Sequence, residues 1–111
     1  MIYLVETGTP AVQVEAIAAL ANLAVNDVNE RAIADLGGIP PIIACARSGA
    51  SELCAQAARA LRNLSVLESN KRIIMDNGGH SILNELAYSS DERVSQQATR
   101  ALANLGDARG K

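Results

Sequence analysis

Ala60-Leu61-Arg62-Asn63-Leu64 decides the fold prediction, because the chain carries the same pattern twice more at a fixed distance. Ala19-Leu20-Ala21-Asn22-Leu23 precedes it by 41 residues, and Ala101-Leu102-Ala103-Asn104-Leu105 follows it by 41 residues. Other positions keep the same step without a gap, as when Gly37-Gly38 returns as Gly78-Gly79. A fixed period of this length predicts one supersecondary unit stacked on copies of itself. Stacked units make a quasi-linear surface that usually binds other molecules.

Composition supports a helical repeat and excludes several functional classes. The 111 residues contain no Phe or Trp and two Tyr, so the core must consist of Ala, Leu, Ile and Val. A net charge of −2 gives no bulk attraction to nucleic acid or to an acidic membrane. The sequence lacks both a long apolar run and a secretory leader pattern. We therefore expect a cytoplasmic protein, with the nucleus as the alternative, and neither nucleic acid nor membrane as its partner.

Apolar spacing within each unit is helical. Leu53, Ala57, Leu61 and Leu64 fall at steps of four, four and three and define one face of a long helix. Ser51 or Asp91 is positioned to cap such a helix, and Pro10 suits the first turn of the first copy. The corresponding apolar sets in the other two copies are Val12, Ala16, Leu20 and Leu23, and Val94, Ala98, Leu102 and Leu105.

Two shorter helices are predicted between successive long ones. The first spans about 30–36 and 71–77, with Ile33 and Ile74 pointing inward, and it ends at the double glycines. We expect these glycines to supply positive φ angles and a sharp reversal. The second helix spans about 40–47 and 81–88, and its first copy starts with prolines that suit a first turn. Strand alternation and Asn-Gly hairpins are missing, which excludes a propeller blade of similar period.

This arrangement resembles the armadillo repeat over essentially the whole chain. The most specific features are Asn63-Leu64 at the end of the long helix, Gly78-Gly79 after the short helix, and Val12-Gln13 at the start of the first long helix. The HEAT repeat is the nearest alternative, but it normally has two helices per unit and no Asn at this register. The resemblance implies an all-α, right-handed armadillo-type α-solenoid, a superhelix of three-helix repeats with a 41-residue period.

Alignment of the units places the repeat boundaries. Ile2 falls at the register of Ile43, so the chain opens part way through a middle helix. We expect a truncated first repeat at 1–25, a second repeat at 26–66, a third at 67–107 and a polar tail at 108–111. The chain thus looks like a piece of a longer array, or a small natural or engineered unit that completes itself by association.

Self-association through uncapped ends is a further expectation. A missing preceding unit would uncover apolar groups at the N-terminal end, and no unit covers the last long helix. Contact between unlike ends would run on into rings or filaments, whereas pairing of like ends would give closed dimers. The residues expected to form these faces are Ile2, Leu4 and Val5 at one end and Val94, Ala98, Leu102 and Leu105 at the other.

Catalytic, metal and cofactor chemistry is poorly supported. His80 is the only histidine, and the register suggests a partly exposed residue at a helix start. Cys45 and Cys54 are interpreted as buried thiols in a reducing compartment. A disulfide is the alternative, but the repeat does not support it, because Ser95 takes the place of Cys54 in the next unit. No phosphate-binding Gly-Lys-Ser/Thr follows the double glycines. We therefore predict no enzyme, no metal site and no cofactor.

Asn22, Asn63 and Asn104 are the first candidate site residues. Asn is unfavourable inside a helix, because its side chain competes for backbone hydrogen bonds. One interpretation is structural, with each Asn satisfying the terminal carbonyls of its own helix. The other is a ladder, because a carboxamide can bond both the N–H and the C=O of a passing peptide. In armadillo-repeat proteins this Asn faces the groove lined by the long helices, and the resemblance implies that role here.

Arginines are the second set of candidates. The family often places an aromatic residue one turn before each Asn, commonly Trp in nuclear-import adaptors, but here those positions are Ala18, Arg59 and Arg100. Arg62 precedes Asn63 and would lie nearby. The departure counts against an import-adaptor role and favours a neutral to acidic peptide. The alternative is that these arginines are solvated or paired with Glu15, Glu52 or Glu92.

The functional hypothesis is a protein-protein interaction module that binds an extended peptide along the long helices. Its candidate peptide-binding residues are Asn22, Asn63, Asn104, Arg59, Arg62 and Arg100. The alternative is a structural spacer or self-associating scaffold segment of a larger armadillo-repeat protein, with no peptide ligand of its own.

Overall fold

The computed structural model describes residues 2–106, and all regular secondary structure within them is α-helical, which confirms the all-α prediction. The proposed tail at 108–111 lies outside the described residues, as does the last residue of the proposed third repeat. The elements are α1 (Ile2–Thr7), α2 (Pro10–Leu23), α3 (Asp27–Asp35), α4 (Ile39–Ala46), α5 (Ser51–Leu64), α6 (Glu68–Asp76), α7 (Gly79–Leu86) and α8 (Glu92–Asn104).

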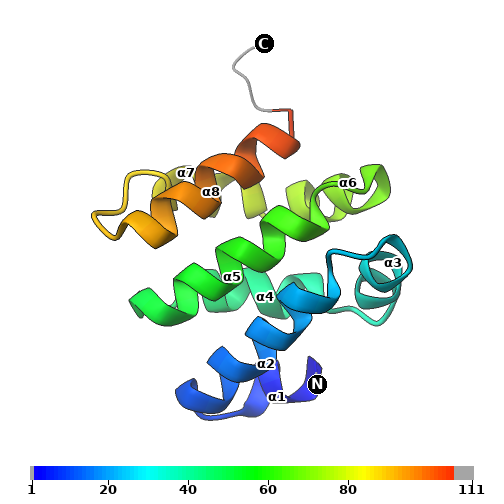
Figure 1. Ribbon diagram of the computed structural model, residues 1–111, viewed down its shortest axis with the longest axis horizontal. Helices are drawn as coiled ribbons and strands as arrows, with labels where there is room; N and C mark the ends of the chain where they lie inside the picture. Colours follow the sequence, from blue (N-terminus) through cyan, green and yellow to red (C-terminus); the bar gives the residue numbers. More distant parts are fainter. Residues whose placement is uncertain (1, 107–111) are drawn as a thin grey trace.

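The three long helices form one layer of the molecule. Helices α2, α5 and α8 lie side by side, with α5 packed against both of the others (Figure 1). Helices α4 and α7 lie behind this layer and pack against α5 and α8, whereas α1 packs on α2. The short helices α3 and α6 contact each other along one flank. Each long helix therefore covers the next one, as expected of a solenoid.

One of the two predicted helix caps, Asp91, is confirmed, and Thr9 is a cap that the sequence analysis did not predict. Thr9 caps α2, where its side chain accepts a hydrogen bond from the Val12 N–H, and Pro10 is the first helical residue. Asp91 caps α8 and accepts from the Arg93 N–H at 3.0 Å. The prediction that Ser51 caps α5 is wrong, because Ser51 is already helical and Ala50 occupies the cap position without a side-chain bond.

Both short helices begin three residues earlier than predicted. Helix α3 starts at Asp27, because the Asn26 side-chain oxygen accepts hydrogen bonds from the N–H groups of Val28 and Asn29. Such a cap satisfies donors that the first turn leaves unpaired, so the helix can begin directly after Asn26. The middle helices α4 and α7 also begin one or two residues earlier than expected.

The two glycines of each pair serve different purposes. Gly37 and Gly78 have φ angles of 78° and 79°, the left-handed conformation that ends a helix and that a side chain disfavours. Gly38 has a φ of −77°. A Cβ on Gly38 would lie 2.8 Å from the side chain of Ile33 and 3.0 Å from its carbonyl oxygen. The prediction of two positive φ angles therefore holds only for the first glycine, and the second provides space for close packing.

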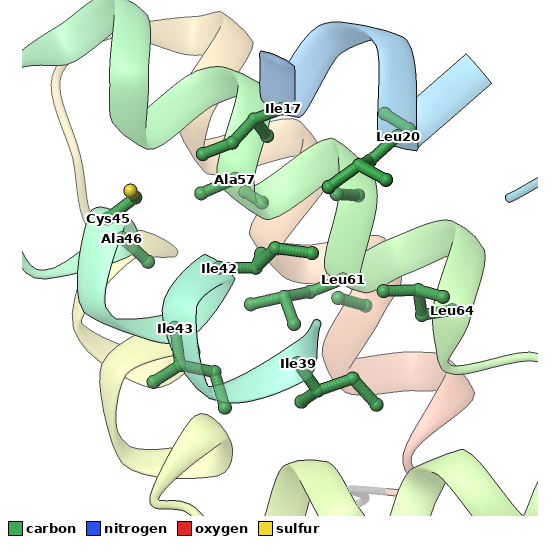
Figure 2. Close-up of a cluster of buried hydrophobic side chains, with 14 of the residues drawn as sticks. Ile17, Leu20, Ile39, Ile42, Ile43, Cys45, Ala46, Ala57, Leu61 and Leu64 are labelled. Atoms are coloured by element: carbon green, nitrogen blue, oxygen red, sulfur yellow. The ribbon is translucent and has the colours of Figure 1, made fainter. Parts of the chain in front are cut away.

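Aliphatic side chains from α4 and α5 form the centre of the core (Figure 2). All four apolar residues predicted for α5, Leu53 to Leu64, are buried, as are Ile33 and Ile74. In the first copy the prediction fails at both ends, because Val12 is 36% and Leu23 is 44% exposed. In the last copy Val94, Ala98 and Leu102 are buried and Leu105 is half-buried. Val5, expected to be uncovered at the N-terminal end, is also buried, whereas Leu4 is 43% exposed. Only the middle repeat has its apolar face covered along the full length.

The two cysteines are free and buried, as predicted. The Cys54 thiol donates to the carbonyl oxygen of Ala46 at 3.3 Å, and the Cys45 thiol faces the carbonyl oxygen of Val5. Burial raises the pKa of the Cys45 thiol, with a smaller contribution from Cys54. Both sulfur atoms therefore act as small apolar groups of the core.

Two polar side chains are buried where α3 meets α6. The carboxamide of Asn70 donates to the carbonyl oxygen of Leu64 at 3.1 Å and to that of Glu30 at 3.4 Å. Through these two bonds Asn70 links α6 to α5, the long helix of the preceding repeat, and to the short helix α3. The side chain of Glu30 is itself buried, and its Oε1 has no hydrogen-bond partner in residues 2–106. Burial raises the pKa of Glu30 and the charge of Asp27 adds to this, whereas a hydrogen bond from the Leu67 backbone lowers it.

Asn70→Ala should lower the free energy of unfolding by about 1–3 kcal/mol, because two buried carbonyl groups lose their donor. Asn29→Ala is the matched control, since Asn29 occupies the same position one repeat earlier and its side chain makes no hydrogen bond within residues 2–106. Urea unfolding of both variants measures the difference. Equal destabilisation of the two would contradict a role for the Asn70 bonds.

Glu30→Gln should stabilise the protein at neutral pH. The pKa of Glu30 in the folded state lies above the ordinary value of 4.5, so the folded chain holds this proton more tightly than the unfolded chain. The wild type therefore loses stability as the pH rises from 4.5 through the folded pKa, and the neutral amide avoids this loss. Thermal melts should show a higher Tm for the variant at neutral pH and a similar Tm below pH 4.5. The exposed Glu85→Gln serves as the control for loss of one charge.

Candidate functional site

The candidate asparagines lie near the ends of the three long helices. Asn63 donates from Nδ2 to the carbonyl oxygen of Ala21 at 2.8 Å, and Asn104 donates to that of Arg62 at 2.9 Å. In both bonds the acceptor lies 42 residues earlier, on the long helix of the preceding repeat. The interpretation that each Asn satisfies the carbonyls of its own helix is therefore wrong for these two. Each one bonds the neighbouring helix.

These bonds leave part of each carboxamide unused. The group has two N–H donors and one oxygen acceptor, and the bond to the neighbouring helix uses one donor. Within residues 2–106, the Oδ1 atoms of Asn63 and Asn104 accept no hydrogen bond, and both side chains are half-buried. The bond to the neighbouring carbonyl fixes the plane of the carboxamide. The remaining donor and acceptor are thus held in a defined direction.

Asn22 has a different environment from the other two. Its side chain is exposed, and its Oδ1 accepts a hydrogen bond from Arg59 Nη1 at 2.9 Å. Arg59 also donates to the carbonyl oxygen of Ala18 at 3.3 Å and to Gln56 Oε1 at 3.0 Å. The guanidinium therefore bridges α2 and α5 at the position where the resemblance led us to look for an aromatic residue.

The other two candidate arginines, Arg62 and Arg100, lie on different helices. Arg62 donates to Gln97 Oε1 at 3.0 Å and so bridges α5 and α8. Arg100 is exposed and borders a shallow hollow of about 250 Å³ on α8, together with Ser95, Gln96 and Thr99. The structure thus brings Arg59 and Arg62 together on α5, one turn apart, and places Arg100 on the neighbouring helix.

Neutral amides are the side-chain partners of Arg59 and Arg62 in the described part of the chain. Within residues 2–106, neither Arg59 nor Arg62 pairs with Glu15, Glu52 or Glu92, which was the alternative interpretation. Glu52 instead bonds Arg93, with 2.7 Å between Oε1 and Nη1. The positive charges of Arg59 and Arg62 therefore have no neutralising carboxylate among residues 2–106, and they remain available to an anionic group.

An ion cluster that the sequence reasoning missed lies at the other end of the same helices. Arg93 contacts Glu52 and also Asp91, where Nη2 and Oδ2 are 3.1 Å apart. The hydrogen bonds from Arg93 hold the pKa of Glu52 and of Asp91 below their usual values, and the two carboxylates raise the pKa of Arg93. The available signal was that Glu52 and Arg93 are 41 residues apart, at the same repeat position.

Groups suited to other chemistry are not assembled in the described residues. No group of three or more His, Cys, Asp or Glu side chains within residues 2–106 could hold a metal ion. His80 is half-buried in the first turn of α7, close to where the register put it. Among the described residues, no helix is long and apolar enough to cross a membrane.

Comparisons with known proteins agree with this architecture. Residues 26–66 match the family described as Armadillo/beta-catenin-like repeat. A solved engineered protein from the Northeast Structural Genomics Consortium is 38% identical with a TM-score of 0.90, over 94% of this chain and 43% of that chain. A designed armadillo repeat protein is 24% identical with a TM-score of 0.88, over 94% of this chain and 44% of that chain.

A second designed armadillo repeat protein, solved in complex with the peptide (KR)4, is 24% identical with a TM-score of 0.87, over 93% of this chain and 44% of that chain. The chain thus spans less than half the length of these solved structures. The comparison with curated proteins gave no match. The armadillo fold is a non-enzymatic scaffold, so no catalytic role is assigned. Residues 26–66 are therefore an armadillo repeat by their family match, and the described residues share the armadillo-repeat fold of these solved structures.

Proposed function

We propose that the chain binds an extended peptide segment of a protein partner across α2, α5 and α8. The observation that carries the proposal is the state of Asn63 and Asn104. Each carboxamide is oriented by a bond to the preceding helix, and each keeps an N–H and an oxygen without a partner in residues 2–106. A passing peptide backbone offers the complementary C=O and N–H groups.

The helix spacing suits such a ligand. Packed helices lie about 8–10 Å apart, and an extended chain advances about 3.3 Å per residue. One Asn per repeat would therefore meet the peptide backbone at every second or third residue. Asn22 joins this set when the peptide displaces Arg59 from its Oδ1, since that oxygen is the acceptor of the Arg59 bond. Backbone contacts give affinity with little sequence preference, so specificity must come from the flanking side chains.

Charge on these helices favours a neutral to acidic peptide. Arg59 and Arg62 have amide partners, and the side chain of Arg100 makes no hydrogen bond or ion pair within residues 2–106. A guanidinium pairs well with a carboxylate or a phosphate and repels lysine and arginine. The designed protein solved with (KR)4 binds a basic peptide. We propose the opposite preference here, in a reducing compartment that suits the free thiols.

A structural spacer is the second candidate function, and a specific observation favours it. Asn63, Asn104 and Arg59 all bond across helices in the absence of any ligand. The same side chains could therefore serve only to fix the stacking of the repeats. Under this alternative the chain is a scaffold segment, and substitution of Asn63 changes stability without any effect on a ligand.

Asn63→Ala should weaken binding of a peptide selected from a peptide array by about 1–3 kcal/mol, because the peptide groups it met are left unpaired. Loss of the bond to Ala21 should cost about 0.5–1.5 kcal/mol of stability without unfolding the chain. Calorimetric titration measures the affinity. Asn77→Ala is the control, since Asn77 is exposed and bonds its own helix at Ile73. Equal affinity of wild type and Asn63→Ala would support the spacer.

Acidic or phosphorylated peptides should bind more tightly than Lys/Arg-rich peptides of equal length, and their affinity should fall as salt rises, because exposed ion pairs are screened. Arg62→Gln should reduce both the preference for acidic peptides and the salt dependence of their affinity. The Arg62 guanidinium bonds the neutral side chain of Gln97, and an anionic peptide group can take the place of that partner. Lys71→Gln is the charge-matched control on α6, where the ammonium already pairs with Glu68. Fluorescence anisotropy at several salt concentrations measures both effects, and tight binding of the basic peptide would reverse the assignment.

A further inference from the structure

Arg59 occupies the atom of Asn22 that a peptide would need. Asn63 and Asn104 bond the preceding long helix through Nδ2, which leaves their Oδ1 as the acceptor for a peptide N–H. In Asn22 this oxygen accepts a hydrogen bond from Arg59 Nη1 at 2.9 Å. The same guanidinium donates from Nη2 to the carbonyl oxygen of Ala18 at 3.3 Å. We call these two bonds from α5 to α2 the Arg59 latch, and while they are made the Oδ1 of Asn22 is blocked.

Side chains along α5 hold Arg59 in this position. Its Nε and Nη2 donate to Gln56 Oε1 at 3.2 and 3.0 Å. Gln56 donates from Nε2 to Glu52 Oε2 at 3.2 Å, which leaves its own oxygen directed at Arg59. Glu52 is fixed in turn by its ion pair with Arg93 of α8. Every acceptor of the Arg59 guanidinium within residues 2–106 is therefore a neutral oxygen.

The same three positions are open one repeat later. The side chain of Arg100 makes no hydrogen bond or ion pair within residues 2–106, and Asn63 Oδ1 accepts no hydrogen bond there. The latch is thus a property of one junction between repeats and not of the repeat itself. The residues at these positions are Gln56, Arg59 and Asn22 in the closed set, and Gln97, Arg100 and Asn63 in the open set.

A difference at one position explains the two states. Gln97 Oε1 accepts a hydrogen bond from Arg62, which reaches it from the neighbouring helix at 3.0 Å. Ala21 stands on α2 where Arg62 stands on α5. Alanine has no side-chain donor, so it leaves Gln56 Oε1 to Arg59. The glutamine then holds Arg59 close to α2, where it meets Asn22.

We infer that an acidic side chain of the peptide opens the Arg59 latch and thereby admits the peptide backbone to Asn22. This inference rests on the proposed peptide-binding function. A carboxylate pairs with a guanidinium through two parallel hydrogen bonds between opposite charges, whereas the amide oxygen of Asn22 offers one neutral acceptor. The carboxylate therefore displaces Asn22 as the partner of Arg59, and the released Oδ1 accepts a peptide N–H. The preferred ligand has Asp or Glu beside the segment that crosses α2.

Two peptides of equal length test this coupling. One is an acidic peptide selected from a peptide array, and the other is the same peptide with every Asp and Glu changed to Asn and Gln. Arg59→Ala should bind the neutral analogue about three- to tenfold more tightly than the wild type does, because one more hydrogen bond becomes available at Asn22. It should bind the acidic peptide about tenfold more weakly, because the carboxylate loses its charged partner. Calorimetric titration measures both affinities.

The opposite signs of the two changes are the signature of the latch. An arginine that only attracted acidic groups would leave the affinity for the neutral analogue unchanged when it is removed. An arginine that only stabilised the stacking of the repeats would weaken both complexes. Arg59→Ala places a strong helix former on a half-buried position of α5, so the variant should keep the helical circular dichroism of the wild type.

Asn22→Ala and Arg100→Ala make the result specific. In the Arg59→Ala background, Asn22→Ala should cancel the tighter binding of the neutral analogue. In the wild-type background it should leave that affinity unchanged, because the latch already blocks Asn22 Oδ1. Arg100→Ala removes the arginine at the same repeat position of α8, which has no latch, and should also leave the affinity for the neutral analogue unchanged.

Asn63→Ala separates failure of the latch from failure of the proposed function. If Asn63→Ala weakens both peptides but Arg59→Ala does not tighten binding of the neutral analogue, the latch is overturned and the proposed function stands. A gain that survives Asn22→Ala also overturns the latch. If Asn63→Ala changes neither affinity, or if the array yields no bound peptide, the proposed function fails and the latch fails with it.

Discussion

The close approach of α5 to its two neighbours is the contact on which the rest of the fold depends. Ala57, Ala58 and Ala60 are completely buried on α5, and Ala21 and Ala98 are buried on the helices to either side. Small side chains allow helix axes to approach closely, and alanine costs the helix nothing in conformational propensity. A chain without Phe or Trp cannot fill wide gaps between helices. Close stacking of alanine-rich helices is therefore how this composition reaches a dense core.

The same close approach determines which polar groups can meet. Because the helices are near one another, the short side chain of Asn63 reaches the carbonyl oxygen of Ala21, and Asn104 repeats the contact with Arg62. Two bonds with the same separation of 42 residues show that adjacent pairs of long helices are related by the same step. The polar contacts therefore report the repeat geometry directly. They also orient the free half of each carboxamide, so one interaction serves both the stacking and the proposed ligand contact.

Sequence periodicity was sufficient to predict the helices and their order, because the apolar positions of the long helices recur with the 41-residue period. Leu61 and Ile74 could be assigned to the core from spacing alone, and both are fully buried. Helix starts were less predictable, since α3 begins three residues before its predicted start, where the side chain of Asn26 caps it. The partners of Arg59 were not predictable either. They depend on the rotamer of a long side chain that can reach Gln56, Asn22 and Ala18 together.

Departures from the repeat therefore carry more functional information than the repeat itself. Positions that obey the period are explained by stacking, as Leu64 and Ala58 are. Ser95, Gln96 and Thr99 of α8 break the pattern in the direction of polarity, whereas Val28 of α3 and Leu36 at its C-cap break it in the direction of apolarity. All five side chains are half-buried or exposed, at positions where the stacking of the repeats does not determine their character.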